Sequence, residues 1–202
     1  MIVTPGFQIY EFKSSTELIT SSLAHCQNLV WSKNTHNYLS SLISYDQLFS
    51  WFQTCIDRVT DEIYPNLYKN NLKFKISAAW ANKSEKSHYH HKHMHPNSWW
   101  SGIYYLTDHE LGGTTKFYSD NPWYKFENAD MFFLQDLVVP PSNITSYKPV
   151  AGNLIIFPSN IMHDTTPNED DHDRYTISFN VFPSGVLGLK HTTNLNLNVK
   201  YA

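Results

Sequence analysis

The residues most suited to chemistry in this chain are its histidines. Five of the eleven histidines lie between His88 and His95. If this segment is extended, His91, His93 and His95 point to one face, because side chains alternate along a strand. Pro96 favours that conformation, since the residue before a proline is kept out of the helical region. Neutral imidazoles at this spacing can bind one transition-metal ion, so the segment predicts a metal site.

A third ligand is expected further along the chain. The pattern of residues 152–159 predicts a turn, then a buried strand and the point where the chain leaves the sheet, and His163 follows. A strand that ends in a loop would present His163 toward the earlier pair, as at the mouth of a β-barrel. We therefore predict His93, His95 and His163 as metal ligands, with His91 in reserve if the register differs by two residues. Taken alone, the histidine-rich tract is equally compatible with plain polar surface.

The segment after His163 predicts an anion pocket beside the metal. Arginine is the preferred side chain for gripping a carboxylate in a partly buried cavity, and a neighbouring hydroxyl adds a donor. An ordinary half-exposed strand would show the same alternation. On a strand the polar face carries Arg174, Thr176, Ser178 and Asn180, and the apolar face carries Tyr175, Ile177 and Phe179.

Helices and short strands must position these residues. Ser14 and Glu17 form a capping-box pattern ahead of apolar residues at helical spacing through Val30. A second helix is predicted to start at Ser44 and to stop before Pro65. From residue 72 the apolar period changes to two, which indicates strands separated by turn signals. The predicted strands cover residues 72–80, 99–106, 114–118, 131–134, 153–157 and 175–182.

Length and composition fit one folded domain. Hydrophobic residues make up 41% of the 202 residues and charged residues 16%, which is enough for a packed core. We expect a single domain over residues 1–202, with a helical support region (1–70), a β core (71–187) and a tail (188–202) of no assigned role. Many short strands punctuated by turns favour a sandwich or barrel.

The same composition limits the partners and the compartment. With a formal charge of −3 and no basic block, a nucleic-acid partner is not expected. The longest apolar runs are far shorter than the roughly 18 residues of a spanning helix, so no membrane insertion is expected. Cys26 and Cys55 lie in apolar helical patterns and predict buried thiols. Without a pattern typical of a secretion signal, we expect a cytoplasmic protein, in the host cell if it is viral.

Four segments in order resemble the iron(II)- and 2-oxoglutarate-dependent oxygenases. They are residues 93–106, 152–159, His163 and residues 174–180, and the likeness covers about half of the chain, from Lys75 to Pro183. It is strongest to the small, phage-associated branch related to prolyl hydroxylases. The resemblance implies a mainly β fold, a double-stranded β-helix (jelly roll, cupin-like), with supporting amino-terminal α-helices and the metal at its open end.

The resemblance also implies Fe(II), the co-substrate 2-oxoglutarate and O2. His93 and His163 would be iron ligands, but most of the family has Asp or Glu two residues after the first histidine, where this chain has His95. We interpret His95 as a ligand in an H-x-H variant. The alternative is that His95 does not bind the metal and only contacts the residues that do. Three imidazoles would leave Fe(II) with a charge of +2, which the 2-oxoglutarate dianion neutralises.

The co-substrate contacts are carried over in the same way. Arg174, helped by Thr176, would bind the C5 carboxylate of 2-oxoglutarate. Tyr105 or Tyr104, on the strand after the first ligand, would contact the same molecule. Asn180, on the polar face shared with Arg174, is included among the expected contacts.

The expected activity is a dioxygenase that releases succinate and CO2 and hydroxylates a peptidyl, prolyl-like side chain or a small molecule. Two other functions use the same fold: a three-histidine zinc hydrolase or cupin-type dioxygenase without 2-oxoglutarate, and a jelly-roll binding module without catalysis. The first gives Arg174 no role, and the second predicts no metal dependence. Four aromatic residues are candidates for a substrate groove, although simple packing explains each of them as well: Trp99, Trp100, Trp123 and Tyr124.

Overall fold

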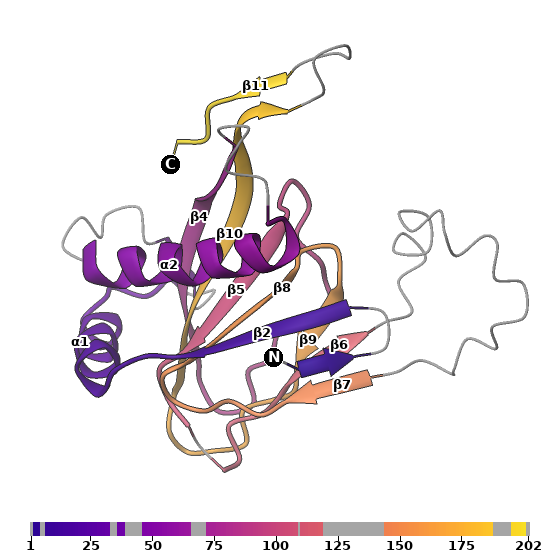
Figure 1. Ribbon diagram of the computed structural model, residues 1–202. Coiled ribbons are helices and arrows are strands. Elements are labelled where there is room, and N and C mark those ends of the chain that lie inside the picture. The colour runs from indigo at the N-terminus through magenta and orange to yellow at the C-terminus, as the bar shows by residue number, and fades with distance from the viewer. Residues whose placement is uncertain are drawn as a thin grey trace, which may run out of the picture.

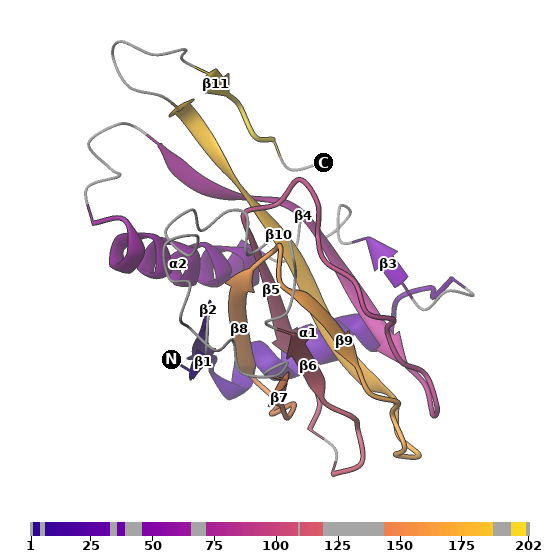
Figure 2. The same ribbon diagram turned by 90° about the vertical axis from the view of Figure 1, so that its right-hand side faces the viewer.

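Two antiparallel sheets form the predicted double-stranded β-helix (Figures 1 and 2). The computed structural model describes residues 2–4, 7–32, 36–38, 46–65, 72–108, 110–118, 144–187 and 195–200. The large sheet has the order β1-β2-β8-β5-β10-β4-β3, with β11 beside β10, and the small sheet has the order β7-β6-β9. The elements are β1 (Ile2–Thr4), β2 (Phe7–Lys13), α1 (Thr16–Gln27), β3 (His36–Tyr38), α2 (Asp46–Ile63), β4 (Lys73–Ser84), β5 (Trp100–Tyr105), β6 (Thr115–Tyr118), β7 (Ile144–Tyr147), β8 (Asn153–Pro158), β9 (Met162–Thr165), β10 (Arg174–Leu187) and β11 (Leu195–Leu197).

The centre of the large sheet is buried on both faces. In β8, Leu154 and Ile156 join the core under the helices, whereas Ile155 and Phe157 join the core toward the small sheet. A strand covered on both sides needs apolar residues at every position, which explains its unbroken apolar run. β10 keeps its alternation instead, because only its Tyr175-to-Val181 side packs under the helices.

Helix α2 covers the outer face of the large sheet (Figure 1). Its Phe52 ring lies 4.7 Å from that of Phe179 and 5.5 Å from that of Tyr104. The helix ends at Ile63, before Pro65 as predicted; the expected start at Ser44 lies outside the described residues. Within the described residues, no helix combines the length and the apolar character needed to cross a membrane.

Helix α1 begins one residue later than its capping pattern predicted. Ser15, not Ser14, is the N-cap, and its hydroxyl accepts a hydrogen bond from the Leu18 amide at 3.3 Å. Ser14 continues the pairing beside β8, and its hydroxyl is bonded to that of Tyr104 at 2.8 Å. The helix also stops at Gln27, three residues before Val30, which is 91% exposed.

Both cysteines are free and buried, as predicted. Cys26 lies in α1 and Cys55 in α2, and both belong to the core under the helices. Burial disfavours the thiolate, so it raises the pKa of each thiol to about 12. Neither thiol is suited to nucleophilic chemistry.

The predicted strands at residues 72–80, 99–106, 114–118, 153–157 and 175–182 are present with small shifts of their ends. The predicted strand at residues 131–134 lies outside the described residues. Five further strands were not predicted, namely β1, β2, β3, β7 and β9. The prediction that placed His163 in a loop is wrong, because His163 lies in β9 and pairs with Phe117 of β6. β9 reads Met-His-Asp-Thr, which is too short and too polar to show an alternating apolar signal.

Candidate metal centre

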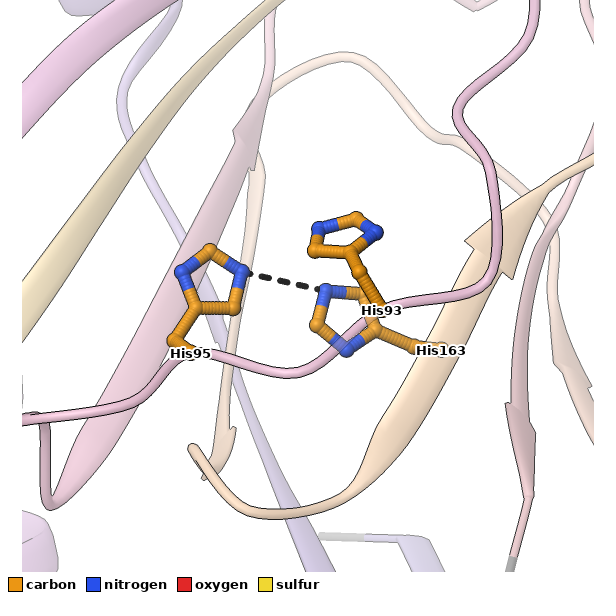
Figure 3. A group of neighbouring side chains, drawn as sticks. All are labelled: His93, His95 and His163. Carbon is orange, nitrogen blue, oxygen red and sulfur yellow. Dashed lines mark hydrogen bonds between the residues drawn. The ribbon is translucent and has the colours of Figure 1, made fainter.

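Two backbone hydrogen bonds bring distant parts of the chain together at the centre of the site. The amide of His93 donates to the carbonyl of His163 at 2.9 Å, and the amide of His163 donates back at 2.8 Å. This is an isolated antiparallel bridge beside the free edge of β9. The bridge brings the two side chains to one side of the chain segments that carry them, and their ring centroids are 4.4 Å apart (Figure 3).

His95 completes a group of three imidazoles (Figure 3). One nitrogen from each of His93, His95 and His163 lies within 4.8 Å of the other two. The Nε2 atoms of His95 and His163 are 3.2 Å apart. These two nitrogens share a hydrogen bond in the metal-free protein, and a single cation bound by both lone pairs would replace it. The structure thus brings the three predicted ligands together.

The other ring nitrogens are held by acceptors. Nδ1 of His93 lies 2.6 Å from the carbonyl oxygen of His91, and Nδ1 of His163 lies 2.9 Å from that of Ile161. A carbonyl can only accept, so each Nδ1 carries its proton and each Nε2 keeps its lone pair. His95 has a hydrogen bond with the Asn180 side chain that favours the protonated ring. Metal-binding histidines are usually oriented in this way.

Burial keeps two of the imidazoles neutral. Desolvation, reinforced by the nearby His93, lowers the pKa of His163 to about 3 and that of His95 to about 4. Only the neutral ring has a lone pair for a metal, so both are ready to bind at neutral pH. Three neutral imidazoles are a donor set that suits Fe(II) among other transition metals.

His91 does not belong to the group. Its side chain is exposed and lies edge-on to Tyr89, with ring centroids 4.9 Å apart. Its contribution is its carbonyl oxygen, which orients His93. The segment therefore does not keep the strand alternation that would have placed His91, His93 and His95 on one face.

The three histidines open into a cavity of about 480 Å³. Its walls come from β4, β5, β10 and the small sheet, and no acidic residue lines it among the residues that the structure describes. The lining residues relevant to the predicted site are His93, His95, His163, Arg174, Thr176, Asn180 and Tyr105. The structure thus brings the predicted metal ligands and most of the predicted anion contacts to one cavity.

Arg174 is a buried cation in the wall of this cavity. It is 4% exposed, and desolvation lowers its pKa. Its guanidinium donates to the carbonyl of Gly112 at 2.6 Å and to the hydroxyls of Ser84 and Thr165 at 3.2 Å each. Among the described residues, no carboxylate pairs with it. A buried guanidinium held only by neutral acceptors is suited to an incoming anion.

Thr176 lies two residues further along the same face. Its hydroxyl oxygen accepts a hydrogen bond from Asn82 Nδ2 at 3.2 Å, and Ser178 accepts another at 3.0 Å. Both hydroxyl protons remain to be donated, in line with the predicted help to Arg174. Asn82 itself was not predicted; its Oδ1 is buried without a partner among the described residues.

The two tyrosines of β5 lie on opposite faces. Tyr105 lines the cavity, is fully buried and shares a 2.7 Å hydrogen bond with Thr115. Tyr104 faces α2, and its hydroxyl is bonded to Ser14. The structure therefore brings Tyr105 to the site but not Tyr104, and the alternation of β5 alone did not reveal which of the two faces inward.

The expected substrate-groove aromatics do not line the cavity where they are described. Trp100 is 4% exposed and packs on Phe74, and Trp99 is half-exposed beside the same ring. Trp123 and Tyr124 lie outside the described residues. The cavity instead contains Trp80 and His90, which the sequence reading did not single out. For Trp80 the alternation of β4 pointed the other way, because it placed Trp80 on one face with Phe74 and Ile76, which pack under the helices. A register shift against β10 reverses the two faces between Ile76 and Ala78, so Trp80 lines the cavity.

Comparisons with known proteins agree with this geometry. A family model described as "Putative 2OG-Fe(II) oxygenase" matches residues 78–180. No curated protein matches. Many solved structures do, including a prolyl-4-hydroxylase from Pseudomonas putida (14% identity, 87% of this chain and 92% of that chain covered, TM-score 0.55). A prolyl hydroxylase from Trichoplax adhaerens, solved with a hypoxia-inducible-factor peptide, is similar (16%, 89% and 84%, 0.57). So is the epimerase SnoN, solved with Fe3+ and alpha ketoglutarate (10%, 89% and 82%, 0.59).

Replacing each of the three histidines separately by alanine tests whether all are ligands. Substituting a residue that only contacts a metal ligand typically weakens metal binding by roughly 10- to 100-fold. We expect His93→Ala, His95→Ala and His163→Ala each to weaken Fe(II) binding by more than this. Anaerobic titration against a competing chelator measures the affinity. His91→Ala is the matched control and should bind as wild type. A loss of roughly 100-fold or less in His95→Ala would show that His95 supports a ligand and does not bind the metal itself.

The lowered pKa values predict how the metal-free protein responds to acid. In the unfolded chain a histidine titrates near 6.5, whereas His95 and His163 stay neutral in the fold down to about 4 and 3. The unfolded state therefore takes up more protons as the pH falls below about 6.5, and the free energy of unfolding decreases. We expect each histidine to contribute roughly 2 kcal/mol to this loss between pH 7 and 4.5.

Denaturant unfolding of the chelator-treated protein across this range measures the effect. His95→Gln should show a shallower dependence on pH than wild type, and His172→Gln, at an exposed histidine outside the cavity, should not. Equal slopes in wild type and His95→Gln would contradict the assignment of a neutral, buried His95.

Proposed function

Because this chain belongs to the 2OG-Fe(II) oxygenase family, we propose that it hydroxylates a peptidyl, prolyl-like side chain. The chain is an Fe(II)- and 2-oxoglutarate-dependent dioxygenase, and the finer identity of its substrate is the proposal. Its cofactors are Fe(II), 2-oxoglutarate and O2. We further propose that it belongs to the small, phage-associated branch related to prolyl hydroxylases and acts in the cytoplasm.

The observation that carries the function is one cavity with a buried cation and a metal-binding group. Arg174 lines the same 480 Å³ cavity as the three histidines, and among the described residues it has no acidic partner. A hydrolase or a dioxygenase without 2-oxoglutarate would leave this buried charge without a purpose. A binding module without a metal would leave three converging imidazoles unexplained. A diacid that spans the two groups accounts for both.

We assign each residue of the cavity a separate role. His93, His95 and His163 hold Fe(II), which, when bound together with 2-oxoglutarate, couples the oxidative decarboxylation of the co-substrate to succinate and CO2 with oxidation of the substrate by O2. Arg174 binds the C5 carboxylate of 2-oxoglutarate, and the hydroxyl of Thr176 donates a hydrogen bond to the same carboxylate. We assign Tyr105 to the wall that keeps this end of the cavity dry, because its hydroxyl is already engaged by Thr115.

Two observations support a peptidyl substrate. The fold is shared with two prolyl hydroxylases, and one of these was solved with a peptide bound. His93 and His95 are only partly buried, so a side chain presented by another molecule can reach them. We propose that residues 1–70 form the support for this core within a single domain of 202 residues, with residues 188–202 as a tail.

Substitution of Arg174 tests the co-substrate assignment. Anaerobic addition of Fe(II) and 2-oxoglutarate to the wild type should produce the weak metal-to-ligand charge-transfer band of the chelate. Arg174→Ala should need about 100-fold more 2-oxoglutarate for the same band, because a charged hydrogen-bonded pair in a buried site is lost. Arg58→Ala, on the outer helix α2, is the control and should match wild type. No band in the wild type would overturn the function.

Substrate class is tested by the oxygen-dependent conversion of peptides. Incubation with proline-containing peptides should release succinate above the level without peptide, and mass spectrometry should find a gain of one oxygen atom on the peptide. Free proline and peptides without proline are the controls. Succinate release that is stimulated only by small molecules would overturn the peptidyl substrate while leaving the dioxygenase assignment intact.

A further inference from the structure

Trp80 lies against the imidazole of His95. The two rings are nearly parallel, at 19°, with centroids 5.6 Å apart. Trp80 is on the cavity-facing side of β4, and β10 and β3 flank it through Ser178 and Tyr38. The backbone of Trp80 is therefore fixed within the sheet, and its indole lies against a ring that comes from a loop.

His95 is supported differently from the other two histidines. His93 and His163 are oriented by the carbonyl oxygens of His91 and Ile161, each two residues away in the chain. The backbone amide of His95 donates to the Ser159 carbonyl at 2.9 Å, and its ring is hydrogen-bonded to His163 Nε2 at 3.2 Å and to the side chain of Asn180 in β10. The support of this imidazole is thus supplied by other strands.

The chain of contacts behind Asn180 is fixed as well. Ser101 donates to Asn180 Oδ1 at 2.9 Å, and Ser101 is bonded to the buried Ser159 at 2.8 Å. Ser159 is the residue whose carbonyl also holds the His95 amide. The edge of the imidazole is therefore held by Asn180 and, without metal, by His163. A metal would replace the bond to His163, so the contact of Trp80 with the face of the ring would then help to restrict its rotation.

We propose that Trp80 is a positioning residue for His95, and that its indole is what allows an imidazole to serve as the second metal ligand. An imidazole offers a flat ring to stack on, whereas a carboxylate at the same place does not. A metal-bound imidazole is also electron-poor, so its attraction to the electron-rich indole face increases when the metal binds. The inference rests on the metal site of the proposed function.

A double-mutant cycle on metal affinity tests this role. Anaerobic chelator competition with Fe(II) alone should show a loss of about tenfold for Trp80→Leu, the size expected for a cation–π contact in a partly buried site. Trp80→Phe keeps an aromatic face and should remain within about threefold of wild type. In a His95→Asp background, Trp80→Leu should change the affinity by less than twofold. The matched control is Trp99→Leu, at a tryptophan that does not line the cavity, and it should bind as wild type.

The visible absorption spectrum of the Co(II)-loaded protein provides a second measurement. It depends on the ligand geometry, so Trp80→Leu should shift its bands and Trp80→Phe should restore them. Wild-type affinity and spectrum in Trp80→Leu would overturn the inference, and so would equal losses in the wild-type and His95→Asp backgrounds. If His95→Asp binds no metal or Trp80→Leu does not fold, a Trp80→Phe variant tenfold weaker than wild type overturns it. A wild type that binds no Fe(II) would instead overturn the proposed function as well.

Discussion

The site depends on the reciprocal backbone pair between His93 and His163. Seventy residues separate the two ligands, and two hydrogen bonds of 2.9 and 2.8 Å join them. Because the connection is made by the main chain, it fixes the spacing of the two residues, and the Nδ1 hydrogen bonds to the carbonyls of His91 and Ile161 then orient the rings. β9 can offer its edge to His93 only because its other edge is paired with β6. The small sheet is therefore the frame that holds the metal ligands.

The large sheet supplies the rest of the cavity through β10, which has one apolar and one polar face. The apolar side of β10 lies under α2, with Phe179 against Phe52, so the strand cannot rotate without exposing that core. Its polar side is thereby fixed toward the cavity, from Arg174 at the anion end to Asn180 beside His95. Hydrophobic packing on one side thus determines where a buried guanidinium is placed on the other. No described residue of α1 or α2 lines the cavity, so the two helices act on the site through this packing.

The sequence was informative where chemistry and alternation coincide. The polar face of β10 and the three histidines were predicted because their residue types are costly to bury without a purpose. The position of His163 within a strand was not, since β9 has four residues and no apolar period. Strand alternation separated Tyr104 from Tyr105 but did not say which of them faces inward. That choice depends on which face α2 covers, and this is a property of tertiary packing.

An imidazole at position 95, in place of a carboxylate, changes the charge of the cavity both without metal and with Fe(II) bound. Without metal, burial lowers the pKa of His95 and His163, so neither of these two ligand positions has to bury a charge. A carboxylate there would have to be desolvated against the face of Trp80, which offers no hydrogen bond to it. With Fe(II) bound, three imidazoles leave a charge of +2, and Arg174 adds another positive charge in the same cavity. A dianionic co-substrate then compensates more positive charge than it would beside a carboxylate ligand. Fe(II) and 2-oxoglutarate therefore favour the binding of each other, and each raises the affinity for the other by the same factor.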